Sequence, residues 1–149
     1  MKRITHVVFA AALTAALNLW TIKGGALYTF IAIASSIAPD VDLGKYHRKL
    51  LHNIFAWMFL VVFLQITAPY LGLEGYYVFV SVTIGWLSHI FLDSLTKKGV
   101  ALLYPFSRKF YGLRIFSGDN LAINILFIIL SLLVLIRYAF TLITALISS

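Results

Sequence analysis

The sequence predicts an all-α polytopic membrane protein, a bundle of about five transmembrane helices forming a single membrane-embedded domain over residues 1–149. Hydrophobic residues make up 62% of the chain and charged residues only 11%, with a mean hydropathy of +0.97. Soluble domains average about 45–50% apolar and about 25% charged residues, and a chain this short has too little interior to bury the surplus. The apolar residues also gather in runs close to the roughly 20 residues that a bilayer requires. The surplus apolar surface is therefore expected to face lipid.

Two apolar runs occupy the first part of the chain. The first extends from about Thr5 to Ile22 and ends near Lys23-Gly24-Gly25. No clear small-residue cleavage site follows it, so we interpret it as a retained first helix rather than a signal peptide. The second, from Ala26 to about Ala38, is short and ends before Pro39, because the residue that precedes a proline avoids the helical conformation.

Three longer runs follow. The third extends from about Asn53 to Leu73 and the fourth from Tyr76 to about Leu92. The fifth is the longest, from Leu121 to Ile147, and only Arg137 interrupts it. Between the last two runs, the segment Thr96 to Asn120 mixes basic and aromatic residues, a composition typical of an interfacial segment that lies against anionic headgroups.

The basic residues predict an orientation, because Lys and Arg in short loops favour the cytoplasmic side. We expect an integral protein of the inner membrane with a cytoplasmic N-terminus, since five crossings then place ten basic residues inside: Lys2, Arg3, Lys45, Arg48, Lys49, Lys97, Lys98, Arg108, Lys109 and Arg114. Only Lys23 lies outside. This bias accounts for the net charge of +7 without nucleic acid, for which no basic stripe with interleaved aromatics is present. Membrane lipids are the expected partners, and a homo-oligomer remains open.

Histidines and aspartates gather at the predicted cytoplasmic helix ends. His89 and Asp93 lie four residues apart and so share one helix face. Ionisable residues within a membrane span usually face the bundle interior and have partners. The pair therefore suits either two metal ligands or a His–Asp hydrogen bond that joins helices.

Three other segments contribute similar residues at the same depth. Asp40 and Asp42 follow Pro39, where they suit a cation or an ordinary turn. Together the candidate metal ligands are His6, Asp40, Asp42, His47, His52, His89 and Asp93. The chain has no cysteine, which excludes disulfides, thiolate ligands and a Cys nucleophile. Imidazole and carboxylate ligands favour a divalent metal, with Zn²⁺ first and Mn²⁺ or Fe²⁺ as alternatives.

A set of short motifs occurs in a distinctive order from His6 to about Phe106. The set comprises Pro39-Asp40-Val41-Asp42, His47-Arg48 with His52, and Gly85-Trp86-Leu87-Ser88-His89-Ile90-Phe91-Leu92-Asp93-Ser94-Leu95-Thr96, then Gly99 and Tyr104-Pro105-Phe106. This order resembles the YdjM-like family of small bacterial inner-membrane, metal-dependent hydrolases. The resemblance implies a membrane-embedded metal hydrolase with these His and Asp residues as ligands.

Two positions depart from the family pattern. Leu51-His52-Asn53 stands where the family tends to have Thr-His-Ser, which removes a hydroxyl beside the histidine. Ser117-Gly118-Asp119-Asn120 stands where the family tends to have Gly-Ser and a Glu, so that Asp119 is only a weak counterpart of that acid.

The leading hypothesis is hydrolysis by metal-activated water at the cytoplasmic headgroup plane. We assign the catalytic roles to Asp42 and His52, and expect a carboxylate that does not bind metal to act as general base. The neighbouring basic residues suit an anionic headgroup, and a phospholipid or another lipid phosphoester is the expected substrate. The alternatives are a divalent-metal transporter, whose site would normally lie near the midplane, or a structural membrane protein that binds metal without catalysis.

Overall fold

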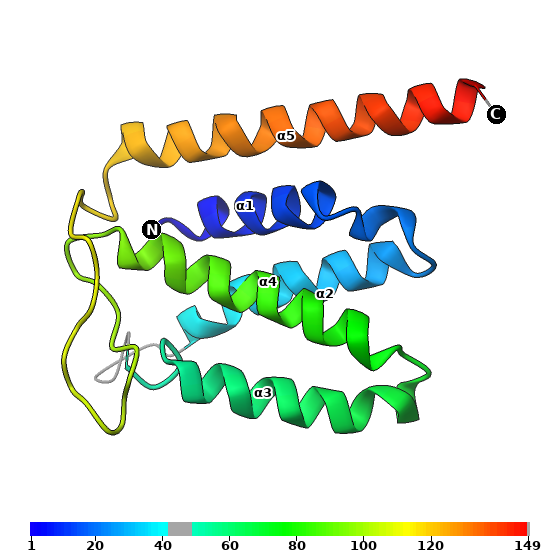
Figure 1. Ribbon diagram of the computed structural model, residues 1–149. Coiled ribbons are helices and arrows are strands. Elements are labelled where there is room, and N and C mark those ends of the chain that lie inside the picture. The colour runs from blue at the N-terminus through cyan, green and yellow to red at the C-terminus, as the bar shows by residue number, and fades with distance from the viewer. Residues whose placement is uncertain (42–48, 149) are drawn as a thin grey trace.

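The computed structural model describes residues 1–41 and 49–148, and these residues form five α-helices with no β-strand beyond two isolated bridges. Figure 1 shows the helices lying side by side, with successive helices running in opposite directions. The predicted all-α fold is therefore confirmed. The helices are α1 (Arg3–Ala16), α2 (Gly25–Ile37), α3 (Ile54–Thr67), α4 (Gly75–Ser94) and α5 (Leu121–Ser148), and short 3₁₀ turns follow the first three as η1 (Leu19–Thr21), η2 (Ala38–Val41) and η3 (Ala68–Leu71).

The first helix differs from its predicted extent, since α1 ends at Ala16 rather than at Ile22. Asn18 adopts the left-handed conformation (φ 58°, ψ 23°), which asparagine tolerates better than most residues. The chain then turns through η1, where the Trp20 indole N–H donates to Thr14 Oγ1 at 3.1 Å. This bond fixes the turn against the end of α1, an arrangement that an unbroken apolar run does not reveal.

Helix α4 occupies the centre of the bundle and packs against α1, α2 and α3. Half of its span is buried, whereas only 6% of the α3 span and of the α5 span is buried. Gly85 makes the close approach to α2 possible, because a Cβ atom there would collide with the Ala32 carbonyl oxygen. Small residues allow this kind of close packing between membrane helices. The central position of α4 explains how its polar residues are kept away from lipid.

Three segments are long and apolar enough to cross a bilayer: Ile54–Leu71, Gly75–Ser94 and Leu121–Ala145. The helix α1 and the segment Gly25–Val41 are apolar but shorter. A helix of 14 residues, such as α1, extends about 21 Å, against a hydrocarbon thickness of about 30 Å. The membrane-helix architecture is thus present. That the two shorter helices also cross the membrane stays a prediction.

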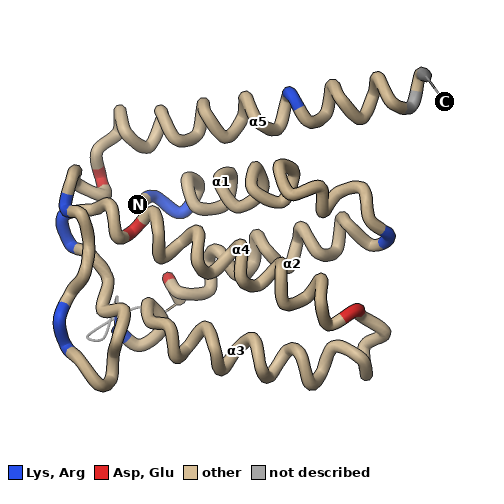
Figure 2. The backbone as a smooth tube through the Cα atoms, in the orientation of Figure 1, with Lys and Arg blue, Asp and Glu red and all other residues tan. Residues whose placement is uncertain are grey.

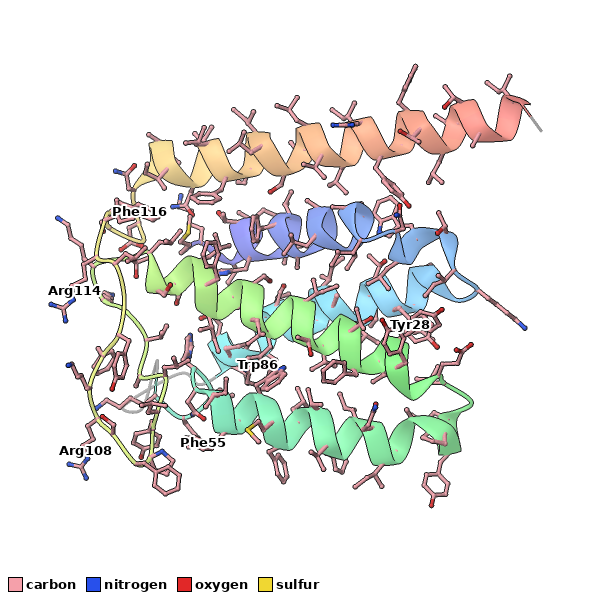
Figure 3. All side chains as sticks on the ribbon, viewed as in Figure 1. Tyr28, Phe55, Trp86, Arg108, Arg114 and Phe116 are labelled. Atoms are coloured by element: carbon pink, nitrogen blue, oxygen red, sulfur yellow. The ribbon has the colours of Figure 1, made fainter. Side chains whose placement is uncertain are left out.

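The segment between α4 and α5 lies across the end of the bundle that also holds the N-terminus (Figure 1). Val100 and Tyr111 exchange two backbone hydrogen bonds of 2.8 Å, and the Ile54 N–H donates to the Leu102 carbonyl at 3.1 Å. Figure 2 shows that most of the charged positions lie at this end. Arg108 and Arg114 are directed outward from the loop (Figure 3). The charged end of the bundle therefore matches the predicted segregation, and its location at a membrane interface stays a prediction.

Candidate metal centre

Helix α4 supplies two buried side chains, His89 and Asp93, which lie one turn apart near its end. Their exposed fractions are 0% and 1%. The Thr96 hydroxyl donates to the Asp93 carbonyl oxygen at 2.8 Å, in the turn that terminates the helix. The four-residue spacing thus places both side chains on the helix face that points into the bundle, as the sequence predicts.

The other two members of the group come from the connection between α2 and α3. Asp40 lies in η2, directly after the buried Pro39. His52 is fully buried and precedes Asn53, the N-cap residue of α3. The Asn53 side chain accepts from the Ala56 N–H at 2.8 Å and donates to the carbonyls of Lys49 and Leu50 at 2.8 and 2.6 Å. This cap fixes the backbone beside His52 and so fixes where the imidazole can reach.

The four side chains, Asp40, His52, His89 and Asp93, converge on one point, and one ligand atom from each lies within 4.8 Å of all the others. The Nε2 atoms of His52 and His89 are 3.1 Å apart. Asp40 Oδ1 lies 3.7 Å from each of these nitrogens, and Asp93 Oδ2 also lies 3.7 Å from each. Ligand atoms at tetrahedral positions 2.0–2.1 Å from a zinc ion would be roughly 3.3 Å apart. The spacing therefore fits one divalent ion bound by two imidazoles and two carboxylates.

A backbone hydrogen bond orients the His89 ring. Its Nδ1 lies 2.7 Å from the Ser36 carbonyl oxygen. A carbonyl only accepts, so Nδ1 is the donor, and Nε2 of the neutral ring presents its lone pair to the centre of the group. This is the arrangement by which proteins usually orient a metal-binding histidine.

His6 borders the group from α1 without belonging to the four. Its ring stacks on that of His89, with centroids 3.9 Å apart and an interplanar angle of 18°. Its Nε2 lies 3.5 Å from Asp93 Oδ1, yet neither ring nitrogen makes a hydrogen bond within the described residues. The amino group of Met1 contacts the same Asp93 oxygen. Asp93 thus directs Oδ2 to the two histidines of the group and Oδ1 to α1.

The structure places the predicted ligands unequally. Four of the seven lie in the group, His6 lies beside it, and Asp42 and His47 fall outside the described residues, so the catalytic role predicted for Asp42 remains a prediction. Asp119 is exposed before α5 and is not part of the group. Sequence reasoning did not identify the contribution of Ser36, which acts through its backbone carbonyl and has no side-chain signature. Asn53 could have been found as a helix N-cap, because it directly precedes an apolar run.

Comparison with known proteins gives one match. The family model described as YdjM inner membrane protein matches residues 1–148 of the chain. No curated protein and no solved structure gives a significant match.

Proposed function

The chain belongs to the YdjM inner membrane protein family, and from this premise we propose that it is a metal-dependent hydrolase that acts on a lipid phosphoester at the headgroup plane. The observation that carries the proposal is the convergence of Asp40, His52, His89 and Asp93 at one end of a membrane-helix bundle. A group with the chemistry and spacing of metal ligands fits this class of enzyme better than a purely structural protein.

The donor set suits a divalent metal of the zinc class. Two imidazole nitrogens and two carboxylates are ligands that Zn²⁺, Mn²⁺ and Fe²⁺ accept. Burial of a carboxylate such as Asp93 is costly unless opposite charge or hydrogen bonds compensate it. The Met1 amino group does so at Oδ1, and a bound cation would do so at Oδ2. Closed structural zinc sites usually contain cysteine, which this chain lacks. The bound metal would supply Lewis-acid activation of water, the chemistry on which metal-dependent hydrolases rely.

Access to the centre is possible from the side of Asp40. This side chain is 14% exposed, whereas the side chains of His52, His89 and Asp93 are at most 1% exposed. Arg3 Nε lies 4.0 Å from Asp40 Oδ2, and the Arg3 side chain is 60% exposed. A substrate that approaches Asp40 therefore meets the exposed Arg3 guanidinium first, which favours an anionic group such as a phosphoester.

The residues around this opening would bind the substrate and orient the metal ligands. Arg3 would hold the anionic group, while the hydrogen bond from His89 to Ser36 keeps the imidazole aligned. Exposed basic residues of the loop, namely Lys97, Lys98, Arg108, Lys109 and Arg114, would attract anionic headgroups to the same face. Stacked on His89, His6 limits how far that ring can turn. These features support a phospholipid or a related amphiphile as the substrate.

The proposal is tested with the purified protein in lipid nanodiscs supplied with Zn²⁺ or Mn²⁺ and a panel of phospholipids. Wild type and Asp119→Asn, which changes an exposed acid at the same end, should release headgroup products that mass spectrometry detects. His89→Ala and Asp40→Asn should reduce the rate at least about 100-fold. If wild type turns over no phospholipid while metal uptake into sealed vesicles depends on His89 and Asp40, the protein is a transporter instead.

A further inference from the structure

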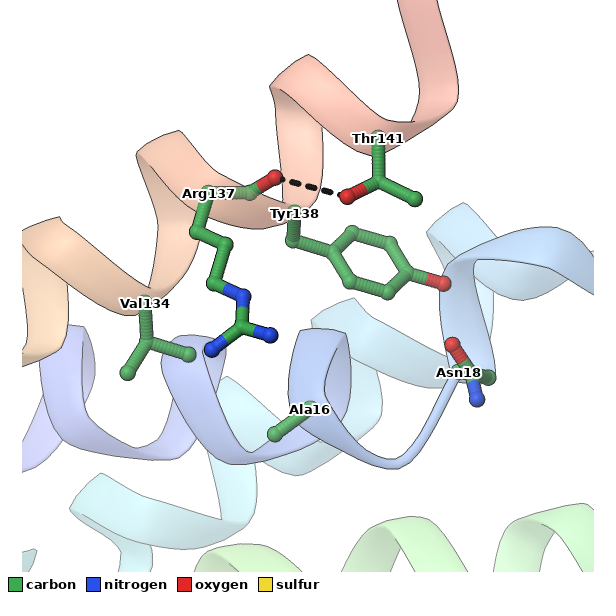
Figure 4. Close-up of a pocket in the computed structure, with 6 residues that line it drawn as sticks. All are labelled: Ala16, Asn18, Val134, Arg137, Tyr138 and Thr141. Atoms are coloured by element: carbon green, nitrogen blue, oxygen red, sulfur yellow. Dashed lines mark hydrogen bonds between the residues drawn. The ribbon is translucent and has the colours of Figure 1, made fainter. Parts of the chain in front are cut away.

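A cavity of about 430 Å³ lies between α1 and α5, away from the metal centre. Its lining residues are Ala16, Asn18, Val134, Arg137, Tyr138 and Thr141 (Figure 4). The volume falls within the range of about 300–1,000 Å³ that small-molecule sites occupy. None of these residues takes part in the proposed hydrolysis, so the cavity needs a separate explanation.

Arg137 is the one charged residue of α5, and it borders this cavity. Figure 4 shows its guanidinium directed from α5 towards α1. Within the described residues no carboxylate forms an ion pair with it; the contact drawn in the figure is the bond from the Thr141 hydroxyl to the Arg137 backbone carbonyl, at 3.0 Å. A charge in a membrane helix normally has a partner or reaches a polar interface. Arg137 therefore presents five hydrogen-bond donors that a ligand can use.

Tyr138 lines the same cavity, with its hydroxyl directed towards Asn18 (Figure 4). The Tyr138 hydroxyl is buried and has no hydrogen-bond partner within residues 1–41 and 49–148. Its ring packs edge-on against Trp20 at a centroid distance of 6.0 Å, so the hydroxyl is held in place near Asn18 (Figure 4). The guanidinium at this cavity matches a phosphate oxyanion, which accepts charge-assisted hydrogen bonds.

The position of Arg137 along α5 places it near the membrane face opposite the metal centre. Sixteen residues separate Leu121 from Arg137, which corresponds to about 24 Å of helix. The hydrocarbon layer is about 30 Å thick. Trp20 and Tyr138 at this level also match the aromatic residues that favour membrane interfaces. A ligand of Arg137 would therefore have its charge at headgroup depth.

An apolar cavity of about 160 Å³ adjoins the first and shares Ala16 and Val134 with it. Its walls include Phe9 and Leu13 of α1 with Phe127 and Leu130 of α5. The two cavities together form a groove between α1 and α5. The apolar residues lie between Arg137 and the metal-centre end of the bundle, so this groove becomes apolar in the direction of the bilayer midplane. A charged site at headgroup depth with an apolar extension towards the midplane has the polarity of a single phospholipid.

We infer that the groove between α1 and α5 binds an anionic phospholipid of the leaflet opposite the metal centre. The phosphate contacts Arg137, and an acyl chain lies along the apolar wall to which Phe9 and Phe127 contribute. Helix α5 packs against α1 and against no other described helix, so a bound lipid would join α5 to the bundle. This lipid is a structural ligand and not the substrate, and the inference does not depend on the proposed activity.

The test measures lipids retained by the purified protein, using native mass spectrometry after exchange into defined phosphatidylglycerol or phosphatidylcholine. Wild type should retain phosphatidylglycerol with an affinity at least about tenfold above that for phosphatidylcholine, because the charged hydrogen bonds favour the anionic headgroup. Arg137→Gln should lower retention of phosphatidylglycerol about tenfold. Lys23→Gln, an exposed basic residue that does not line the groove, should leave it unchanged. Val134→Trp, which fills the groove and leaves the charge, should lower retention of both lipids about tenfold.

Thermal unfolding and gel filtration establish whether each variant is folded. Should Arg137→Gln fail to fold, Val134→Trp decides the question alone. Retention of phosphatidylglycerol at the wild-type level by folded Arg137→Gln or by Val134→Trp would overturn the inference. It would be overturned equally if wild type were a dimer that Val134→Trp converts to a monomer with no change in bound lipid, since the groove would then be an interface between copies.

Discussion

The Nε2 atoms of His52 and His89 face each other at 3.1 Å, although 37 residues separate the two histidines in the chain. One ring precedes α3 and the other lies on the buried face of α4, and a carboxylate oxygen flanks the pair on each side at 3.7 Å. The Ser36 carbonyl already receives the Nδ1 proton of His89. Two facing lone pairs would repel each other, so either a proton on His52 or a cation occupies the space between the two nitrogens, and a divalent cation would also balance the two carboxylates.

Metal should stabilise the folded protein through this group. A ligand at about 1,000 times its dissociation constant contributes about 4 kcal/mol to the free energy of unfolding. We expect Zn²⁺ or Mn²⁺ to raise the unfolding temperature of wild type in a concentration-dependent way, and a chelator to reverse the change. His52→Ala should show no such response. An equal response in wild type and His52→Ala would mean that the stabilising ion binds elsewhere.

Gly85→Ala should weaken both the fold and the metal site. The new methyl group would collide with the backbone of α2, and overpacking of this kind typically costs about 1–3 kcal/mol. Displacement of α2 would also move the Ser36 carbonyl away from His89, so metal affinity should fall together with stability. Gly75→Ala, at the first residue of α4, faces only the Gln65 side chain and is the matched control. Metal titration and thermal unfolding of both variants check the prediction, which fails if the two variants behave alike.

Asn53→Ala should destabilise α3 by about 1 kcal/mol, the usual cost of losing an N-cap. Asn53→Ser keeps a capping oxygen and should lose much less. The Asn53 amide also donates to the carbonyls of Lys49 and Leu50 beside His52, and neither alanine nor serine can supply both of these bonds, so both variants should bind metal less tightly than wild type. Denaturant unfolding and metal titration measure the two effects, and wild-type metal affinity in both variants would contradict the link between Asn53 and His52.

The predicted orientation can be tested with single cysteines, because the natural chain has none. In intact cells a membrane-impermeant thiol reagent should label Glu74→Cys, in the turn between α3 and α4, and leave Lys97→Cys unlabelled. After the cells are opened, both should react. Labelling of Lys97→Cys from outside would reverse the orientation and place the metal centre on the other face.

The sequence predicts the architecture well, because long apolar runs and clustered basic residues are strong signals. Five helices and their approximate extents follow from those runs, and the four-residue spacing of His89 and Asp93 predicts a shared face. The early end of α1 could not be predicted, since the Trp20–Thr14 hydrogen bond and the left-handed Asn18 arise from tertiary packing. The sequence remains apolar across that turn, so its composition does not mark the end of the helix.

The site was predicted as a set of residue types and not as a geometry. Common depth identified His6, Asp40, His52, His89 and Asp93 as neighbours, and the structure brings them together. Depth could not distinguish His6, which stacks on His89, from His52, whose Nε2 faces that of His89. That distinction depends on helix rotation and on the α3 cap, and both are set by packing between distant segments.

We propose that Asp40, His52, His89 and Asp93 together bind one divalent ion. The most direct measurement is X-ray absorption spectroscopy of the purified protein after exposure to Zn²⁺, together with metal analysis of wild type and His89→Ala. We expect one ion per chain in wild type, with nitrogen and oxygen ligands at about 2.0–2.1 Å, and loss of that ion in His89→Ala. A wild-type protein that holds no Zn²⁺, Mn²⁺ or Fe²⁺, or that holds the same ion after His89 is removed, would contradict it.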